Sequence, residues 1–480
     1  MSVSRSVTKI KRGDFLINEN EIQYGKSGKY QIETILGQGG FGKVVKCVNL
    51  DTKEVMAVKI VRNRHDWVGR REVAILKKLR ELDQDKNNLV KFSEHFSYKG
   101  CMCLTFELLD LSIWHFMKKR KFEPLHLSEI RVITQQMLVA VEALKSIGLV
   151  HADIKPDNVM LVNHTSQPLR VKLIDFGLAR PVNRLQQCMT VQAVGYRAPE
   201  VFLGLPLNEA IDMWSLGCVV AYMYIGQNLY VGDFAFEVMR VITQIHGQPE
   251  DHLLDSGVKT MFYFKKEKDP PGASWRPRTP ELTMQTSSST SSQSTSSTEF
   301  TSLDDLTKAR PKVKNRFERE DTKAFLSFLK HVLRLDAEKR MTASQALGHR
   351  FITLRHLSSN PKAKDYLSSV SLMTKNNQLE ETIVEEFITS SEVVKCKGSH
   401  INTSDHPRSA GASKIHLNKT YMMGRNCRIP LDRTLISASH NPNTITNDGT
   451  TEFVEIKTRK KNLKRIRTFF SKLSKYMCWK

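Results

Sequence analysis

The stretch GLVHADIKPDNVML, residues 148–161, sets charged and polar residues between two apolar runs. Three of these residues suit the transfer of a phosphoryl group. Asp153 can accept the proton of a substrate hydroxyl, Lys155 can neutralise the phosphoryl group in transit, and Asn158 can bind a metal ion. This spacing predicts the loop of an active site, which needs a phosphate-binding site and a second metal ligand elsewhere in the chain.

The second metal ligand follows in the motif LIDFG. There Asp175 stands seventeen residues after Asn158, at the end of a β-branched run. Its carboxylate is placed to hold Mg²⁺ that bridges nucleotide phosphates. The motif RAPE then ends at Glu200, 25 residues after Asp175. Any one of these short motifs can arise by chance, but their common order and spacing favour a functional explanation.

The phosphate-binding site is predicted upstream. GQGGFGKVV places Gly37, Gly39 and Gly42 in the pattern G-x-G-x-x-G-x-V between two predicted strands, so backbone can approach phosphates closely. Alone, this pattern also fits an ordinary glycine-rich hairpin. Lys59 follows in AVK, where its ammonium can pair with the α- and β-phosphates and with Glu72. A solvated helix charge is the alternative for Glu72, but the apolar stripe beside it favours a position directed towards Lys59.

The apolar pattern divides the chain into a strand-rich part and a helix-rich part. β-branched runs predict strands up to about residue 109, interrupted by the helix that carries Glu72. From about Leu111 the spacing is mostly helical, and Gly148 is the expected end of a long helix. We therefore expect an α+β fold with a small β-rich lobe and a larger, mostly helical lobe. The predicted strands cover 29–37, 43–50, 54–61, 89–98 and 101–109, and the predicted helices include 69–82 and 128–147.

Composition marks the segments around this domain. Regular structure is expected to begin near Tyr30, and the chain turns polar and irregular after Leu354. The run TSSSTSSQSTSST holds twelve Ser/Thr in thirteen residues and predicts a disordered surface loop. The predicted organisation is an N-terminal arm at 1–29, a domain at 30–354 with the disordered loop at 286–298, an irregular tail at 355–456 and a basic amphipathic segment at 457–480.

The net charge of the chain is +23, and much of it belongs to the tail. Residues 355–480 hold 22 Lys/Arg against 11 Asp/Glu, and residues 457–480 hold ten basic residues and no acidic one. A basic tail is no nucleic-acid-binding motif, so we expect no direct binding of nucleic acid. Eight cysteines without a CxxC pair indicate reduced thiols, and the sequence shows no signal peptide or long apolar run, so we expect a soluble intracellular protein.

Taken together, the motifs resemble those of eukaryotic protein kinases from about Tyr30 to Leu354. More narrowly, the chain resembles the homeodomain-interacting protein kinases in HADIKPDN, in GLPLNEAIDMWSLGCVVA and in VITQIHGQPEDHLL. The resemblance implies a two-lobed kinase fold that transfers the γ-phosphoryl of ATP to serine or threonine hydroxyls of proteins. It also implies a preference for a proline after the acceptor, transcription regulators among the partners, and a nuclear or cytoplasmic location.

The resemblance also assigns the residues of the predicted site. ATP and Mg²⁺ are expected between the lobes, with Phe106 behind the adenine pocket. Asp212 is expected to anchor the catalytic loop, and Glu200 to pair with Arg340. The catalytic residues are Lys59, Glu72, Asp153, Lys155 and Asn158, the metal ligands are Asn158 and Asp175, and the ATP-binding residues are Leu36, Gly37, Gln38, Gly39, Gly40, Phe41, Gly42, Val44, Ala57, Lys59, Glu107 and Leu109.

Ala152 stands where many kinases carry an arginine, and this bears on regulation. Where that arginine is present, a phosphate on the activation segment commonly neutralises it. The resembled family instead uses a phosphotyrosine held by arginines. Thr190 occupies that tyrosine's position and Val194 one of the arginine positions, although Arg197 remains. We therefore hypothesise activity without tyrosine phosphorylation of this segment, with phosphorylation of Thr190 as the alternative.

Other interpretations compete with these. A pseudokinase scaffold is the main alternative, but it has no need to retain the predicted ATP and metal ligands together. Residues 83–94 match part of a calcium loop, yet Asn88 replaces the required glycine, which favours a plain turn. The segment 457–480 fits nuclear import, weak contact with an anionic membrane surface or a calmodulin-like protein, a helix that folds back on the kinase, or a solvated tail.

Overall fold

The computed structural model describes residues 17–40, 42–62, 65–267, 274–279, 300–311, 315–358 and 360–368. The predicted loop at 286–298, the segment 457–480 and Phe41 lie outside the described residues. None of the described helices is long and apolar enough to cross a membrane.

A six-stranded antiparallel sheet forms the first lobe, in the order β1-β2-β3-β4-β6-β5. Side chains alternate between its faces. Met56 and Val58 of β4 are buried in an apolar cluster on one face, so Ala57 and Lys59 lie on the other. The elements are β1 (Ile22–Tyr24), β2 (Lys29–Gln38), β3 (Gly42–Asn49), β4 (Val55–Val61), α1 (Asp66–Lys78), β5 (Phe92–Tyr98) and β6 (Cys101–Glu107), so every predicted strand and the helix are confirmed within a few residues.

Regular structure begins at β1, before Tyr30, so the prediction of an arm over 1–29 is wrong for its last residues. The turn from β1 to β2 is held from β5 by Glu94. Its carboxylate accepts hydrogen bonds from the backbone N–H groups of Lys26 and Ser27 and from the Tyr30 hydroxyl. A strand of three residues is too short to show a period in the sequence, and Glu94, which holds the turn after it, is distant along the chain.

The calcium-like pattern at 83–94 begins with the predicted turn, at residues 84–88, and ends in β5. Asp83 accepts the backbone N–H groups of Asp85 and Lys86, and Glu94 is used at the β1–β2 turn. The described ranges contain no group of three or more His, Cys, Asp or Glu side chains arranged to hold a metal ion.

Helices dominate the second lobe. The helix predicted at 128–147 is confirmed as α3, and Gly148 beyond its end has φ +67°. Helix α5 is buried along almost its whole length, with Trp214 in its second turn. The helices are α2 (Ile113–Lys119), α3 (Leu127–Ser146), α4 (Pro199–Leu203), α5 (Ala210–Ile225), α6 (Ala235–His246), α7 (Asp251–Ser256), α8 (Arg316–Val332), α9 (Ala343–Leu347), α10 (Arg350–Thr353) and α11 (Arg355–Ser358).

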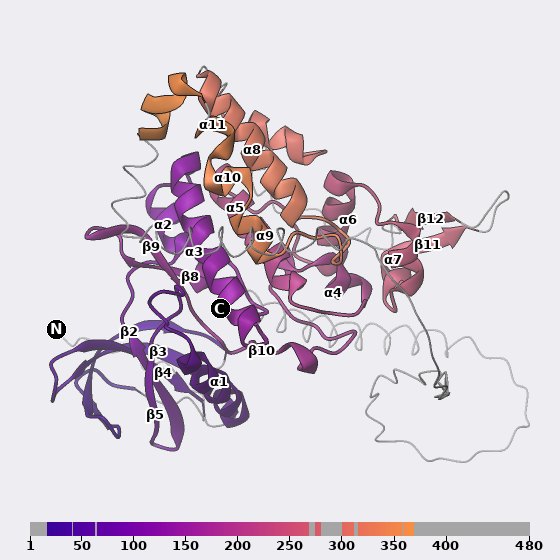
Figure 1. Ribbon diagram of the computed structural model, residues 1–480. Helices are drawn as coiled ribbons and strands as arrows, with labels where there is room; N and C mark the ends of the chain where they lie inside the picture. Colours follow the sequence, from indigo (N-terminus) through magenta and orange to yellow (C-terminus); the bar gives the residue numbers. More distant parts are fainter. Residues whose placement is uncertain are drawn as a thin grey trace, which may run out of the picture. The chain divides into compact units, whose positions relative to one another are not determined.

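Short antiparallel strand pairs complete this lobe. They are β7 (Leu149–Val150) with β10 (Arg180–Pro181), β8 (Val159–Asn163) with β9 (Gln167–Leu173), and β11 (Phe264–Glu267) with β12 (Ser274–Pro277). The first two pairs flank the predicted catalytic loop and the LIDFG motif. In Figure 1, strands β2 to β5 and helix α1 lie at the bottom, and helices α3, α5 and α8 lie above them, which is the predicted two-lobed arrangement.

The expectation of an irregular tail from residue 355 is wrong for 355–368. Helix α11 buries Leu357, and the Tyr366 hydroxyl donates a hydrogen bond to Asp321 of α8 at 2.7 Å. Asp321 is also paired with Arg131 of α3. Isolated apolar residues in a polar stretch give no periodic signal, so the sequence did not reveal that this segment packs on the helices.

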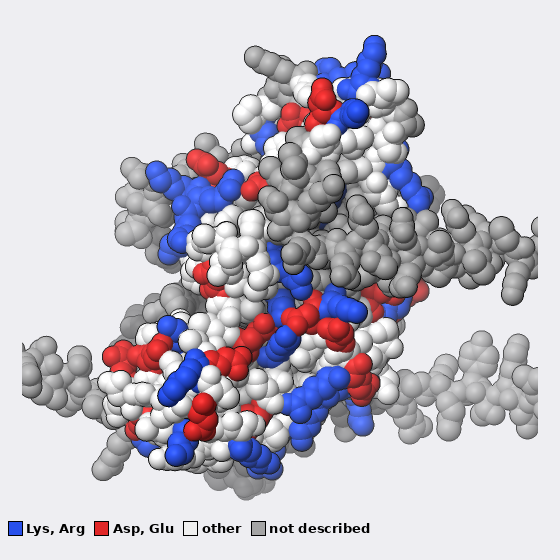
Figure 2. All heavy atoms as spheres, turned by 60° about the vertical axis from the view of Figure 1, so that its left-hand side comes forward, with Lys and Arg blue, Asp and Glu red and all other residues white. Residues whose placement is uncertain are grey.

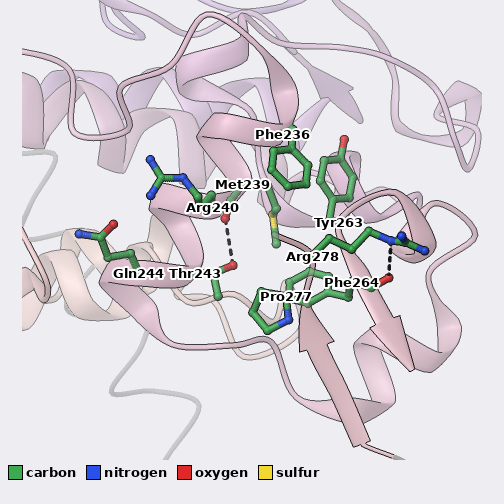
Figure 3. Close-up of a pocket in the computed structure, with 9 residues that line it drawn as sticks. All are labelled: Phe236, Met239, Arg240, Thr243, Gln244, Tyr263, Phe264, Pro277 and Arg278. Carbon is green, nitrogen blue, oxygen red and sulfur yellow. Dashed lines mark hydrogen bonds between the residues drawn. The ribbon is translucent and has the colours of Figure 1, made fainter. Parts of the chain in front are cut away.

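A groove lies between α6 and the β11–β12 hairpin (Figure 3). The rings of Phe236 and Tyr263 stack in its wall, with centroids 6.4 Å apart. Tyr263 also meets Phe202 of α4 edge-on. None of the predicted ATP-site residues lines this groove.

Candidate active site

Lys59 connects the two lobes through ion pairs. Its Nζ lies 2.7 Å from Oε1 of Glu72 in α1 and 2.8 Å from Oδ1 of Asp175, which follows β9. Glu72 is 1% exposed, so it is not a solvated helix charge, and the predicted ion pair is present. Burial alone would lower the pKa of Lys59, but the charges of Asp175 and Glu72 outweigh burial and raise this pKa above its ordinary value. The ammonium is therefore held in its charged form.

The glycine-rich turn between β2 and β3 leaves open space. The N–H of Gly39 donates to the carbonyl of Gly42 at 2.9 Å, which closes the turn. A Cβ added to Gly37, Gly39 or Gly40 would meet no heavy atom of the described residues within 4 Å. A Cβ on Gly42 would lie 2.0 Å from the Ile60 carbonyl oxygen, so the close approach of β3 and β4 requires glycine there.

Apolar residues and Lys59 share one face of the sheet. Val44 lies directly opposite Lys59 in the β3–β4 register, and Ala57 is two residues from Lys59 along β4. Leu36 and Gln38 are exposed at the end of β2, and Leu109 is buried after β6. The open glycine turn, the apolar face and the fixed ammonium fit the phosphates and base of a nucleotide.

The residues of the predicted catalytic loop come together. Lys155 Nζ donates to Oδ2 of Asp153 at 3.1 Å, and Asn158 Nδ2 donates to the same oxygen at 3.1 Å and to the Asp153 carbonyl at 2.8 Å. All three residues are buried. Because the amide nitrogen of Asn158 is used within the loop, its oxygen is the atom that fits a metal ion.

Asp212, in the first turn of α5, holds this loop. Its carboxylate accepts the backbone N–H of His151 at 2.6 Å and that of Ala152 at 2.9 Å, so the anchor implied by the resemblance is present. Ala152 has φ +62°, a left-handed conformation that costs energy for a residue with a Cβ. Its carbonyl accepts the N–H of Gln192 at 3.0 Å. These bonds on both sides of Ala152 hold the strained backbone in place.

His151 links the predicted catalytic loop to the LIDFG segment, a contact that the sequence does not reveal. Its Nε2 lies 2.9 Å from the carbonyl oxygen of Ile174, and its ring meets Phe176 edge-on. The neighbouring Asp175 also has a left-handed backbone, with φ +58°. The available signal was a histidine two residues before Asp153, but a histidine in an apolar context does not by itself indicate its partner.

The carboxylate of Glu107, at the end of β6, forms an ion pair within the protein. Lys172 of β9, 2% exposed, lies 2.7 Å from Oε1 of Glu107 and 2.6 Å from Oδ1 of Asp85. The predicted contact of Glu107 with ATP stays a prediction, and the Glu107 carboxylate is already paired with Lys172. Lys172 was also missed, because a lysine in a strand is usually exposed, although apolar residues on both sides of it signalled burial.

The ion pair between Glu200 and Arg340 is present, as the resemblance implied. The guanidinium nitrogens lie 2.6 and 2.9 Å from the two carboxylate oxygens, and both side chains are buried. Arg340 also lies over the ring of Trp214 in α5. This pair fixes the end of the activation segment against the centre of the helical lobe.

The activation segment is held by neutral groups around Arg197. Its guanidinium donates to the carbonyls of Val191 at 2.9 Å and Gln192 at 3.0 Å, and it lies over the ring of Phe202. Thr190, at the position of the family's tyrosine, is exposed. The arginine that the resemblance assigns to a phosphate is thus already bonded to backbone.

The surface charge of the described residues is mixed on the face shown in Figure 2. There Lys and Arg side chains lie among Asp and Glu side chains. The strongly basic segment 457–480 lies outside the described residues. The described residues of this face therefore form no continuous basic surface.

Comparison with known families agrees with this site. Residues 30–352 match the family model of the protein kinase domain, which covers more than half of the chain. The chain therefore belongs to the protein kinase family.

Among its relatives are homeodomain-interacting protein kinases. It is 39% identical to homeodomain-interacting protein kinase 2 of Mus musculus over 356 residues, 73% of this chain and 30% of that protein. It is 37% identical to homeodomain-interacting protein kinase 1 of Mus musculus over 401 residues, 82% of this chain and 33% of that protein. With homeodomain-interacting protein kinase 4 of Homo sapiens it shares 32% identity over 352 residues, 70% and 57% of the two chains. The chain thus spans about a third of the length of the first two relatives.

Proposed function

We propose that this chain is a serine/threonine protein kinase that transfers the γ-phosphoryl of ATP to protein hydroxyls. The observation that carries the proposal is the pair of ion pairs that Lys59 forms with Glu72 and Asp175. A fixed cation beside a metal-ligand carboxylate, next to a glycine turn with open space, suits phosphate binding. Mg²⁺ held by Asp175 and Asn158 would neutralise charge on the phosphates.

The protein groups act mainly by position and charge, because phosphoryl transfer asks little covalent chemistry of the enzyme. Asp153 orients the acceptor hydroxyl and takes its proton. Lys155, bonded to Asp153, places a positive charge beside the phosphoryl group in transit. Lys59 holds the nucleotide phosphates. A pseudokinase scaffold would gain nothing from this arrangement.

Two substitutions test the proposal. Lys59→Ala removes the phosphate-binding cation, and Asp153→Asn removes the proton acceptor with little change of shape. Each is expected to lower kcat/KM for peptide phosphorylation by at least about a hundredfold. The assay is transfer from ATP to a peptide library, with Lys77→Ala, an exposed lysine of α1, as the control. Mutants as fast as the parent would contradict the assigned roles, and an inactive parent would favour the scaffold.

We further propose that the acceptor is followed by proline. Gln192 has φ +67°, and its carbonyl and that of Val191 are both bonded to Arg197. Because both carbonyls already accept hydrogen bonds from Arg197, the backbone N–H of a substrate residue beside them gains no hydrogen bond to them. Proline, which lacks this N–H, therefore loses no hydrogen bond there. The same peptide library tests this preference, which fails if Ser-Pro and Ser-Ala peptides react equally.

Partners and location are proposals from the relatives. Their names point to homeodomain proteins, so transcription regulators are the proposed substrates. The location is then the nucleus, the cytoplasm or both, with residues 457–480 as the proposed import signal. A fluorescent fusion with and without these residues tests this, and an unchanged distribution would count against it.

A further inference from the structure

The loop from Thr190 to Ala198 is attached to the catalytic loop one residue from the proposed base. The Gln192 N–H donates to the carbonyl of Ala152 at 3.0 Å, and Asp153 is the next residue. Any movement of Gln192 therefore changes the distance between this loop and the carboxylate that orients the acceptor. What holds Gln192 decides where a substrate chain meets Asp153.

The side chain of Gln192 is what holds it. The residue is 4% exposed. Its Nε2 donates to the carbonyl of Ile211 at 2.8 Å and to Oγ of Ser215 at 2.7 Å, and its Oε1 accepts the N–H of Ala198 at 3.0 Å. The amide thus uses both N–H groups and its oxygen. A buried amide with all its hydrogen bonds formed specifies one position, because any other leaves polar groups unpaired.

Ser215 extends this attachment to the far end of the loop. Its Oγ donates to the carbonyl of Tyr196 at 2.7 Å, and the Tyr196 hydroxyl donates to Asn228 at 2.6 Å. The hydroxyl of Ser215 is therefore bonded on one side to Gln192 and on the other to Tyr196. One buried serine of α5 thus binds the loop at two points, Gln192 and Tyr196.

Helix α5 is the common support of the catalytic loop and this loop. Asp212 binds the N–H groups of His151 and Ala152, and the preceding residue, Ile211, binds Gln192. Both contacts come from the first turn of the same buried helix. Two adjacent residues of α5 thus set the separation of the two loops. Asp212 binds the catalytic loop, and the uncharged carbonyl of Ile211 binds Gln192.

We propose that Gln192 is a positioning residue that fixes the substrate-facing loop, residues 190–198, relative to Asp153. The proposal rests on the proposed kinase function. Gln192 does not touch the reacting atoms. It acts through its side-chain bonds to Ile211 and Ser215, which keep the loop in the conformation that accepts proline.

The test is Gln192→Met in the full chain, a change that keeps the length of the side chain and removes its hydrogen bonds. We expect kcat/KM for a Ser-Pro peptide to fall about tenfold and the preference for Ser-Pro over Ser-Ala to shrink. The KM for ATP and the slow hydrolysis of ATP without peptide are expected to stay within about twofold of the parent. A purely structural role would change these as well.

Ser215→Ala is the second variant, since a smaller buried residue is less disruptive to folding. It is expected to change the peptide kinetics in the same direction, and its effect with Gln192→Met is expected to be less than additive. Gln186→Met, an exposed glutamine of the same segment, is the matched control. An unchanged peptide KM and proline preference in Gln192→Met, or an equal loss for peptide and ATP, would overturn the proposal.

Hydrogen exchange separates this inference from the proposed function. In Gln192→Met the backbone amides of residues 190–198 are expected to exchange faster than in the parent, while those of α3 are unchanged. If the parent transfers no phosphate, the proposed function fails, and the hydrogen-exchange rates alone test the positioning role of Gln192. Unchanged protection of residues 190–198 would then overturn the positioning role.

Discussion

Ala152 combines a buried methyl group with a left-handed backbone beside the proposed base. The small side chain brings no cation that an activation-segment phosphate would have to neutralise. Arg197 is bonded to the carbonyls of Val191 and Gln192, so it too has partners without a phosphate. Hydrogen bonds of the segment to its own backbone thus support the hypothesis of activity without tyrosine phosphorylation.

Thr190→Ala tests this hypothesis at the residue concerned. Thr190 is exposed, and its neighbours are held by other contacts, such as the bond from Lys259 to the Cys188 carbonyl at 2.9 Å. We expect the variant to keep kcat/KM within about twofold of the parent, because no contact of the segment depends on a phosphate there. Kinetic assays on phosphatase-treated protein check this, with mass spectrometry of residue 190. An inactive variant together with full phosphorylation of Thr190 in the parent would refute the hypothesis.

At the scale of elements, the sequence predicted those helices and strands whose apolar pattern is set by residues close together in the chain. The strands from β2 to β6 and the helices α1 and α3 have clear periods, and Lys59 and Glu72 lie within β4 and α1 as predicted. Strand β1 and helix α11 were missed because both are short. The contacts that hold them are also distant along the chain: Glu94 binds the β1–β2 turn, and α11 packs on α8. Lys172 and Gln192 were missed for a related reason, since a buried polar side chain is recognised only by its partners in space.

The glycine-rich turn offers an element-scale prediction. Gly42→Ala would place a Cβ 2.0 Å from the Ile60 carbonyl oxygen and force β3 and β4 apart. We expect it to lower the free energy of unfolding by about 2 kcal/mol and to raise the KM for ATP. Gly39→Ala, with no atom of the described residues within 4 Å of the added Cβ, is the matched control for stability. Urea unfolding and ATP titration measure both effects, and equal stability of the two variants would contradict this packing.

At the scale of the whole molecule, the helical lobe is tied together where α5, α6 and the Glu200–Arg340 pair meet. His246 at the end of α6 lies 2.6 Å from the Tyr230 hydroxyl, and its ring packs near Trp214. Burial, with a contribution from the charge of Arg340, lowers the pKa of His246 to about 4. The histidine is therefore neutral in the folded protein at neutral pH.

This histidine makes stability depend on pH in a defined direction. In the unfolded chain His246 binds a proton near pH 6.5, whereas in the folded chain it does so only near pH 4. The unfolded state thus gains protons first, and the free energy of unfolding is expected to fall as the pH falls from 6.5 to 4, by up to about 1.4 kcal/mol per pH unit from this group. His246→Gln, which retains a hydrogen-bond partner for Tyr230, is expected to flatten this dependence. Urea unfolding between pH 4.5 and 7 measures it, with His252→Gln at an exposed histidine as the control. Equal slopes for the parent and His246→Gln would show that His246 is not the group that destabilises the fold in acid.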